Sequence, residues 1–182
     1  MDTRILKTKK SLFDAFVELR SQKPLEKITV KEITDAAHIS KQTFYLHYKD
    51  IYDLADQIES ELIEQMCQDL PNIENIMDNI GFVTVTLFKR AISQDSIFKT
   101  IFSDTRRISL ANGIERELKK VVYNQRPELR ADLKTNIYLS ALIHGCYNSY
   151  QEYKTIDQDK VIQIIGDIVH CMSEGYNTNF KR

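Results

Sequence analysis

The ten residues from Ser40 to Lys49 carry side chains that suit nucleic acid, and none of the ten is acidic. Lysines neutralise phosphates, while amide, hydroxyl and imidazole groups hydrogen-bond to phosphates or to base edges in a major groove. An ordinary solvated helix would include Asp or Glu among these positions. The composition therefore favours a polyanion-binding surface, formed by Ser40, Lys41, Gln42, Thr43, Tyr45, His47, Tyr48 and Lys49.

Two short helices are expected to position these side chains. Thr29 followed by Glu32 is a capping-box pattern, which predicts a helix over residues 30–37. Ser40 can cap a second helix over residues 40–48. The pair is predicted to be a helix-turn-helix, in which the amino-terminal part of the second helix meets base edges.

The apolar residues of this segment are spaced to form one small core with a preceding helix over residues 3–21, which Pro24 ends. The two helices also need a small residue where they cross closely, and either Ala36 or Ala37 satisfies that need. The expected core residues are Ile33, Ala36, Ala37, Ile39, Phe44 and Tyr48.

The chain resembles the TetR family of transcriptional regulators over about residues 3–60. The matching residues are the Thr29 helix start, Ala36-Ala37, Ile39-Ser40-Lys41, Thr43-Phe44-Tyr45 and His47-Tyr48-Lys49. The resemblance implies a DNA-binding domain at residues 1–49 and a helical regulatory and dimerisation domain at residues 50–182. It also implies a homodimer that binds a palindromic operator in double-stranded DNA.

Side-chain chemistry divides the polar residues into two groups. The amide of Gln42 both donates and accepts, which matches N6 and N7 of adenine, and Thr43 and Tyr45 are expected to read or approach bases beside it. Phosphate contacts are expected from Lys41, Tyr48 and Lys49, with Thr29 capping near a phosphate and His47 at a phosphate or in the groove.

Two positions depart from the family pattern. His38 occupies the turn, where the family often has Gly or Asn, and His tolerates a left-handed backbone better than most residues. Gln42 replaces a common glycine. The resulting Gln-Thr-Phe-Tyr sequence is similar to that of smaller family members, including regulators of dihydroxyacetone kinase genes, some of which activate transcription.

The expected function is a repressor released by a small apolar effector; the alternative is an activator, or a regulator controlled by a protein partner.

Composition and charge agree with a DNA-binding head on a helical body. Residues 1–50 hold ten Lys/Arg and seven Asp/Glu, a net charge of +3, whereas residues 51–182 hold fifteen and nineteen, a net charge of −4. No apolar segment follows the start, and the longest uncharged run, residues 135–151, is too short and polar to span a bilayer. Three widely spaced cysteines fit reduced thiols. We therefore expect a cytoplasmic protein without a membrane partner.

With only five glycines and three prolines, the chain is expected to form long helices. Apolar periodicity predicts an all-α fold of about nine helices. After the first three, these are expected from residue 51 to before Pro71 and over residues 82–92, 96–102, 114–123, 127–153 and 160–176, with Pro127 as a first helical residue and Asp157 as a cap.

The last two helices carry the expected dimer interface. Ala141, Gly145 and Ser149 form a stripe of small residues, whereas Ile137 and other apolar residues are assigned to different faces. A helix that is apolar nearly all round is buried on more than one side, which a second subunit would allow. A purely intrachain core is the alternative. The matching stripe on the last helix is Val161, Ile165, Ile168 and Met172.

An effector pocket, if the middle helices enclose one, is expected to be lined by Phe82, Leu87, Phe98, Phe102, Tyr123 and Tyr138. The alternative is that these residues fill the core.

No cofactor is expected, and the histidines and cysteines lack metal-site spacing. A small helical enzyme acting on an apolar substrate would need a convergent acid–base or metal set, which the sequence does not offer. A DNA-binding protein controlled by a bound co-activator, without a ligand, is the stronger rival.

Overall fold

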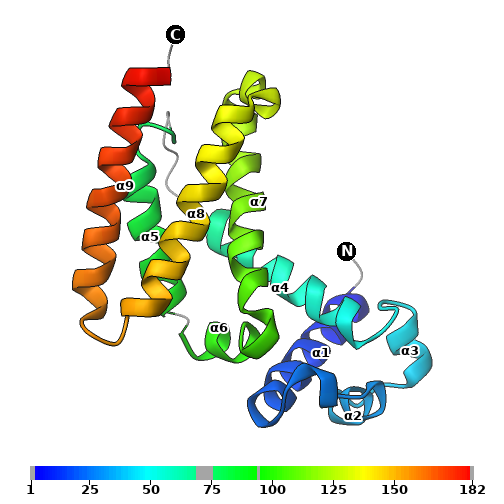
Figure 1. The fold of residues 1–182 in the computed structure, drawn as a ribbon. Helices are drawn as coiled ribbons and strands as arrows, with labels where there is room; N and C mark the ends of the chain where they lie inside the picture. Colours follow the sequence, from blue (N-terminus) through cyan, green and yellow to red (C-terminus); the bar gives the residue numbers. More distant parts are fainter. Residues whose placement is uncertain (1–2, 69–75, 94, 181–182) are drawn as a thin grey trace. The chain divides into compact units, whose positions relative to one another are not determined.

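Nine α-helices and three 3-10 turns, with no strand, make up the described part of the chain in a computed structural model (Figure 1). The structure describes residues 3–68, 76–93 and 95–180. The predicted all-α fold is confirmed. The helices are α1 (Thr3–Gln22), α2 (Val30–Ala36), α3 (Lys41–Tyr45), α4 (Ile51–Gln68), α5 (Ile80–Ser93), α6 (Asp95–Ile101), α7 (Arg107–Gln125), α8 (Leu133–Tyr153) and α9 (Gln158–Phe180).

The chain folds into two compact units. The head unit comprises residues 1–62 and 95–109, and the body unit comprises residues 63–94 and 110–182. The head therefore takes in α6 and the 3-10 turn Asp104–Arg106 as well as the amino-terminal helices. The expected functional division between residues 49 and 50 stays a prediction.

The core of the head unit is built from helices close in sequence. Leu12 and Phe16 of α1, Ile33 of α2 and Phe44 of α3 are at most 1% exposed. Burial of a side chain of this size contributes about 1.5–3 kcal/mol. These residues fix α2 and α3 against α1, because helices of seven and five residues are too short to be stable alone.

Polar contacts attach residues 103–106 to the rest of the head unit. The guanidinium of Arg106 donates to Glu59 at 2.7 and 2.8 Å and also pairs with Asp56. Burial raises the pKa of Glu59, and the bonds from Arg106 oppose that rise. Arg20 donates to Ser103 Oγ at 2.5 Å. Removing one partner of a buried charge pair is costly, so these contacts hold the later segment to the amino-terminal helices.

In the body unit, α5 and α8 both pack on α9 (Figure 1). The α5–α9 crossing is close because glycines lie on both sides of it: a Cβ at Gly81 would lie 2.9 Å from the carbonyl oxygen of Gly166. Glycine is costly inside a helix, so its presence in both helices here reflects the close approach of two backbones.

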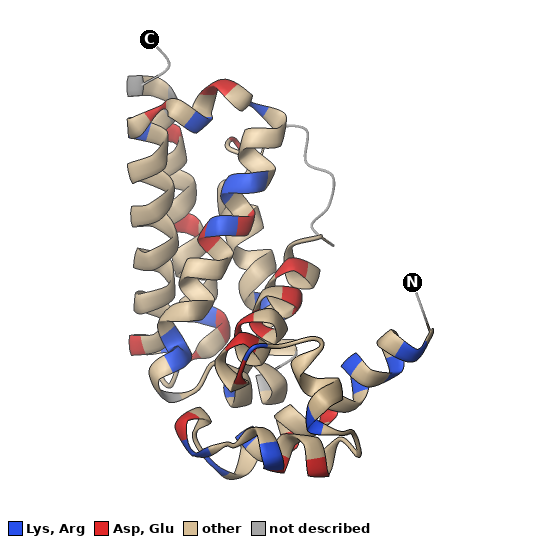
Figure 2. Ribbon diagram, turned by 90° about the vertical axis from the view of Figure 1, so that its right-hand side faces the viewer, with Lys and Arg blue, Asp and Glu red and all other residues tan. Residues whose placement is uncertain are grey.

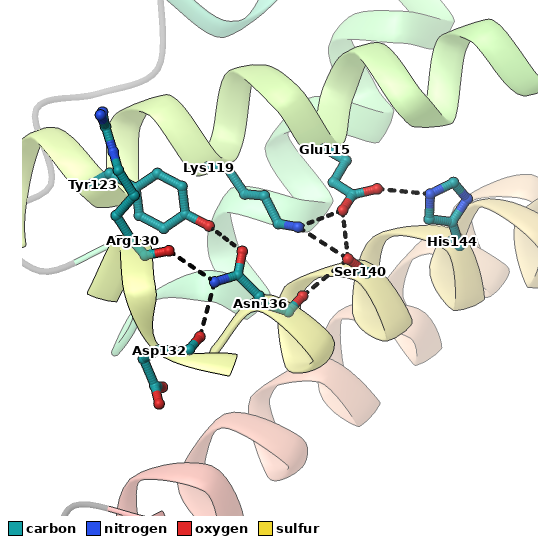
Figure 3. A network of polar contacts seen from close by, with 8 residues as sticks. All are labelled: Glu115, Lys119, Tyr123, Arg130, Asp132, Asn136, Ser140 and His144. Atoms are coloured by element: carbon teal, nitrogen blue, oxygen red, sulfur yellow. Dashed lines mark hydrogen bonds and ion pairs between the residues drawn. The ribbon is translucent and has the colours of Figure 1, made fainter. Parts of the chain in front are cut away.

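A polar seam joins α7 to α8 (Figure 3). Glu115 accepts hydrogen bonds from Lys119 at 2.6 Å and from Ser140, and its second oxygen lies 2.9 Å from His144 Nε2. Burial alone would raise the pKa of Glu115, but the bonds from Lys119, Ser140 and His144 lower it to about 2. The carboxylate therefore stays ionised, and both of its oxygens have polar partners.

Two expected helix starts are wrong. Pro127 begins the 3-10 turn Pro127–Ala131, and α8 starts only after Asp132, whose carboxylate accepts from Thr135 N at 2.8 Å. Helix α7 begins at Arg107 instead of residue 114, since the low helix propensity of Gly113 hides the pattern of its first two turns. Asp157 does cap α9 as expected, accepting from Lys160 N at 3.0 Å.

The close contact of α5 and α9 at Gly81 predicts how a substitution there changes stability. Gly81→Ala should lower the free energy of unfolding by about 1–2 kcal/mol, because overpacking against a backbone oxygen outweighs the gain in helix propensity. Gly175→Ala in α9 is the matched control, since a Cβ there has nothing within 4 Å, and it should stabilise slightly. Urea unfolding of both variants measures the difference; a Gly81→Ala variant as stable as the control would contradict the close crossing.

Candidate nucleic-acid interface

The first helix of the predicted helix-turn-helix begins at a complete capping box. Thr29 Oγ1 accepts from Glu32 N at 3.3 Å, and Glu32 Oε2 accepts from Thr29 N at 3.0 Å, which confirms the cap read from the sequence. Lys23 donates to Glu32 at 2.5 Å, and this bond, followed by those from Thr29, lowers the pKa of Glu32 to about 2. The start of α2 is thereby tied to residues just before it.

The turn between α2 and α3 depends on His38. Its φ of 54° is the left-handed conformation that the sequence suggested for this position. Ala37 is 6% exposed and Ala36 is exposed, so Ala37 is the buried one of the two small residues. Ile39 N then donates to Thr34 O at 3.0 Å and closes the turn.

Helix α3 divides into a buried side and an exposed side. Ser40 caps it by accepting from Thr43 N at 3.0 Å. Phe44 is fully buried and Tyr48, 5% exposed, packs on it with ring centroids 5.6 Å apart. The exposed side consists of Lys41, Gln42, Tyr45 and Leu46.

The predicted DNA-binding residues therefore differ in availability. Lys41, Gln42, Tyr45 and Lys49 are exposed, and Thr43 and His47 are half-buried. The hydroxyls of Thr29 and Ser40 serve as helix caps. Burial raises the pKa of Tyr48 and leaves its ring in the core, so its phosphate contact stays a prediction that packing does not favour.

Asp53, in the first turn of α4, holds the backbone of Lys49 in place. Asp53 Oδ2 accepts from the backbone N–H of Lys49 at 2.9 Å, and this bond lowers the pKa of Asp53. The Lys49 side chain is exposed four residues after α3 ends, and its charge also helps to lower the pKa of Asp53.

The expected pocket residues are divided between the two units. Phe98 and Phe102 belong to the head unit, where their ring centroids lie 5.4 Å apart, and both are 5% exposed. The other four are in the body unit. There Phe82 is 60% exposed, Leu87 is buried, Tyr123 donates to Asn136 at 2.6 Å, and Tyr138 stacks on Tyr176. The pocket stays a prediction.

The expected dimer stripes lie mostly at the surface of the body unit. Ala141, Gly145 and Ser149 are exposed, and a Cβ at Gly145 would have nothing within 4 Å. Val161 is half-buried, and Ile165, 6% exposed, packs within the chain. The assignment of Ile137 to another face is wrong, because it is 60% exposed one turn before Ala141. The exposed large hydrophobic residues of α8 and α9 are Leu133, Ile137, Tyr153, Ile164, Ile168 and Met172.

Neither a metal site nor a membrane span is found among the described residues. No group of three or more His, Cys, Asp or Glu side chains there could hold a metal ion. Likewise, no described helix combines the length and apolarity that crossing a bilayer requires.

Comparison with known proteins agrees with this geometry. A family model described as "Bacterial regulatory proteins, tetR family" matches residues 12–58. A TetR transcriptional regulator from Rhodococcus sp. RHA1 superposes with a TM-score of 0.59 and 12% identity, covering 99% of this chain and 100% of that chain. The dihydroxyacetone kinase operon activator DhaS superposes with a TM-score of 0.61 and 18% identity, covering 92% and 96%. No curated protein matches the sequence.

The left-handed turn residue can be tested directly. His38→Val should be less stable than His38→Gly by about 1–2 kcal/mol, since a β-branched side chain strongly disfavours this conformation. The same two substitutions at His170, a helical residue of α9, should give the opposite order because glycine is the poorer helix former. Free energies of unfolding from denaturant titration provide the comparison. Equal stability of the two His38 variants would count against the turn described.

Proposed function

Because the chain belongs to the TetR family of bacterial regulatory proteins through its amino-terminal domain, we propose that it regulates transcription by placing α3 in the major groove of duplex DNA. The observation that carries this proposal is the exposed side of α3, which presents Lys41, Gln42 and Tyr45 without a carboxylate. The buried Phe44 on the opposite side holds that surface in place.

The exposed residues divide into reading and positioning groups. Gln42 lies near the amino end of α3, where side chains meet base edges, and its amide is able to pair with adenine. Tyr45 lies one turn further along the same exposed side. Lys41 and Lys49 carry full charges on flexible stems and contact phosphates, which fix register but do not read sequence.

We further propose that two copies associate through α8 and α9. Between Lys134 and Glu152, α8 has no Asp, Glu, Lys or Arg, and Figure 2 shows long uncharged stretches, drawn in tan, on the carboxy-terminal helices. Leu133 and Ile137 on α8 and Ile168 on α9 are 54–70% exposed in the single chain. Their burial against a second copy would remove this surface from water, and the small residues after Ile137 let backbones approach.

For regulation, we propose repression that a small apolar effector relieves. A ligand would release DNA by binding better to a dimer whose heads are wrongly spaced. The hydroxyl of Tyr138 is buried without a hydrogen-bond partner within the described residues, which supports an otherwise apolar effector with one polar group that bonds to it in the body unit. The alternative is an activator or a regulator that a protein partner controls: the DhaS structure, similar in fold over most of the chain, is named as an activator. A compound that raises the melting temperature and lowers operator affinity together would identify an effector.

Two variants separate reading from positioning. Gln42→Ala should cost roughly 1–3 kcal/mol on the true operator, relax preference at one position per half-site, and leave the salt slope unchanged. Lys49→Ala should weaken all sequences alike and reduce the salt slope by about one ion. Selection of random DNA followed by salt titration measures both effects. Unchanged base preferences for Gln42→Ala would show that the residue does not read sequence.

The proposed dimer is tested at Gly145. Because the chain itself leaves room for a side chain there, Gly145→Leu should fold normally but clash across a two-fold interface, at about 1–3 kcal/mol for each copy. Sedimentation should show more monomer, and operator affinity should fall although the head is untouched. Asn112→Leu, at an exposed position of α7, is the control. A Gly145→Leu protein with an unaltered dimer would place the interface elsewhere.

A further inference from the structure

Leu46 is an aliphatic side chain on the surface that α3 offers to DNA. It is 76% exposed, more than Tyr45 at 58%, whereas Phe44 and Tyr48 beside it are buried. Single exposed leucines are ordinary on protein surfaces, so exposure alone says little. The position of Leu46 relative to Gln42 is what connects its exposure with DNA binding.

The backbone places Leu46 one helical turn after Gln42. Leu46 keeps helical dihedral angles, with φ −71° and ψ −22°, and its N–H donates to Gln42 O at 3.1 Å. Residues four apart lie on the same side of a helix. The two side chains therefore belong to one exposed strip, and whatever groove receives Gln42 also receives Leu46.

The chemistry of the groove limits what Leu46 can contact there. Leucine has no donor or acceptor, and the C5 methyl of thymine is the one apolar group on a major-groove base edge. Against any other edge, Leu46 would displace water from a polar group without replacing its hydrogen bond, which carries a penalty. The side chain thus favours thymine both by apolar contact and by disfavouring the other bases.

We propose that Leu46 is a specificity-determining residue that reads the methyl group of a thymine. A helical turn advances about 5.4 Å and a base step about 3.4 Å, so this thymine lies within about two base pairs of the base that Gln42 contacts. The inference rests on the proposed function, since it requires α3 to enter the major groove.

The test replaces each thymine of the selected operator, one at a time, with deoxyuridine, which removes only the methyl group. The full-length protein should lose affinity about fourfold per half-site at one thymine near the Gln42 base, and little at the others. Leu46→Ala should bind the unmodified operator more weakly by a similar factor and lose its sensitivity to deoxyuridine at that position. Ile108→Ala, which removes an aliphatic side chain 67% exposed outside α3, should keep the full deoxyuridine response.

Several outcomes would overturn the proposal. Equal tolerance of deoxyuridine at every thymine, or selected half-sites without thymine in the stated window, would exclude a methyl contact; the unmodified protein alone decides both. A Leu46→Ala protein that keeps the deoxyuridine response would assign the methyl contact to another residue. Failure of the unmodified protein to select any duplex is a separate result, because it overturns the proposed function before the deoxyuridine series begins.

Discussion

The burial of Phe44 is the interaction on which the DNA-binding surface depends. Helix α3 has only five residues, so it cannot maintain its conformation or direction without tertiary contacts. With Phe44 fully buried and Tyr48 packed beside it, the helix is held from one side. The opposite side is thereby presented to solvent as a rigid strip, and removal of such an aromatic side chain typically costs about 3–5 kcal/mol.

The caps and the turn convert that anchored helix into a defined recognition surface. Thr29 and Glu32 fix the start of α2, Ser40 fixes the start of α3, and His38 reverses the chain between them. The polar contacts of Arg106 and Arg20 then join residues 103–106 to the same unit. Within the head unit, the guanidinium of Arg106 bonds to Glu59 on α4.

Local signals allowed much of the head to be predicted from sequence. The capping box at Thr29, the Ser40 cap and the aromatic spacing of Phe44 and Tyr48 all involve residues within four positions of their partners. Contacts between distant residues left no such signal. Arg20 and Ser103 are 83 positions apart, and the close approach of Gly81 to Gly166 depends on two helices whose packing no periodicity specifies.

For the carboxy-terminal helices, too, the sequence does not specify how the helices pack. Their apolar character could be predicted, but its division between core and surface could not, because α8 is apolar on several faces. Ile165 therefore proved buried and Ile137 exposed, contrary to their expected faces. Leu46 was absent from the predicted DNA-binding residues because those were chosen for donors, acceptors and charge, and its exposure became known only from the structure.

We propose a protein that reads duplex DNA as a symmetric pair of recognition helices. The most direct test is a genome-wide footprint of the purified protein on DNA from its own source. A symmetric pair predicts protected inverted repeats whose half-sites lie in successive major grooves, about one helical turn apart. Protection without sequence enrichment, or single sites without two-fold symmetry, would contradict it.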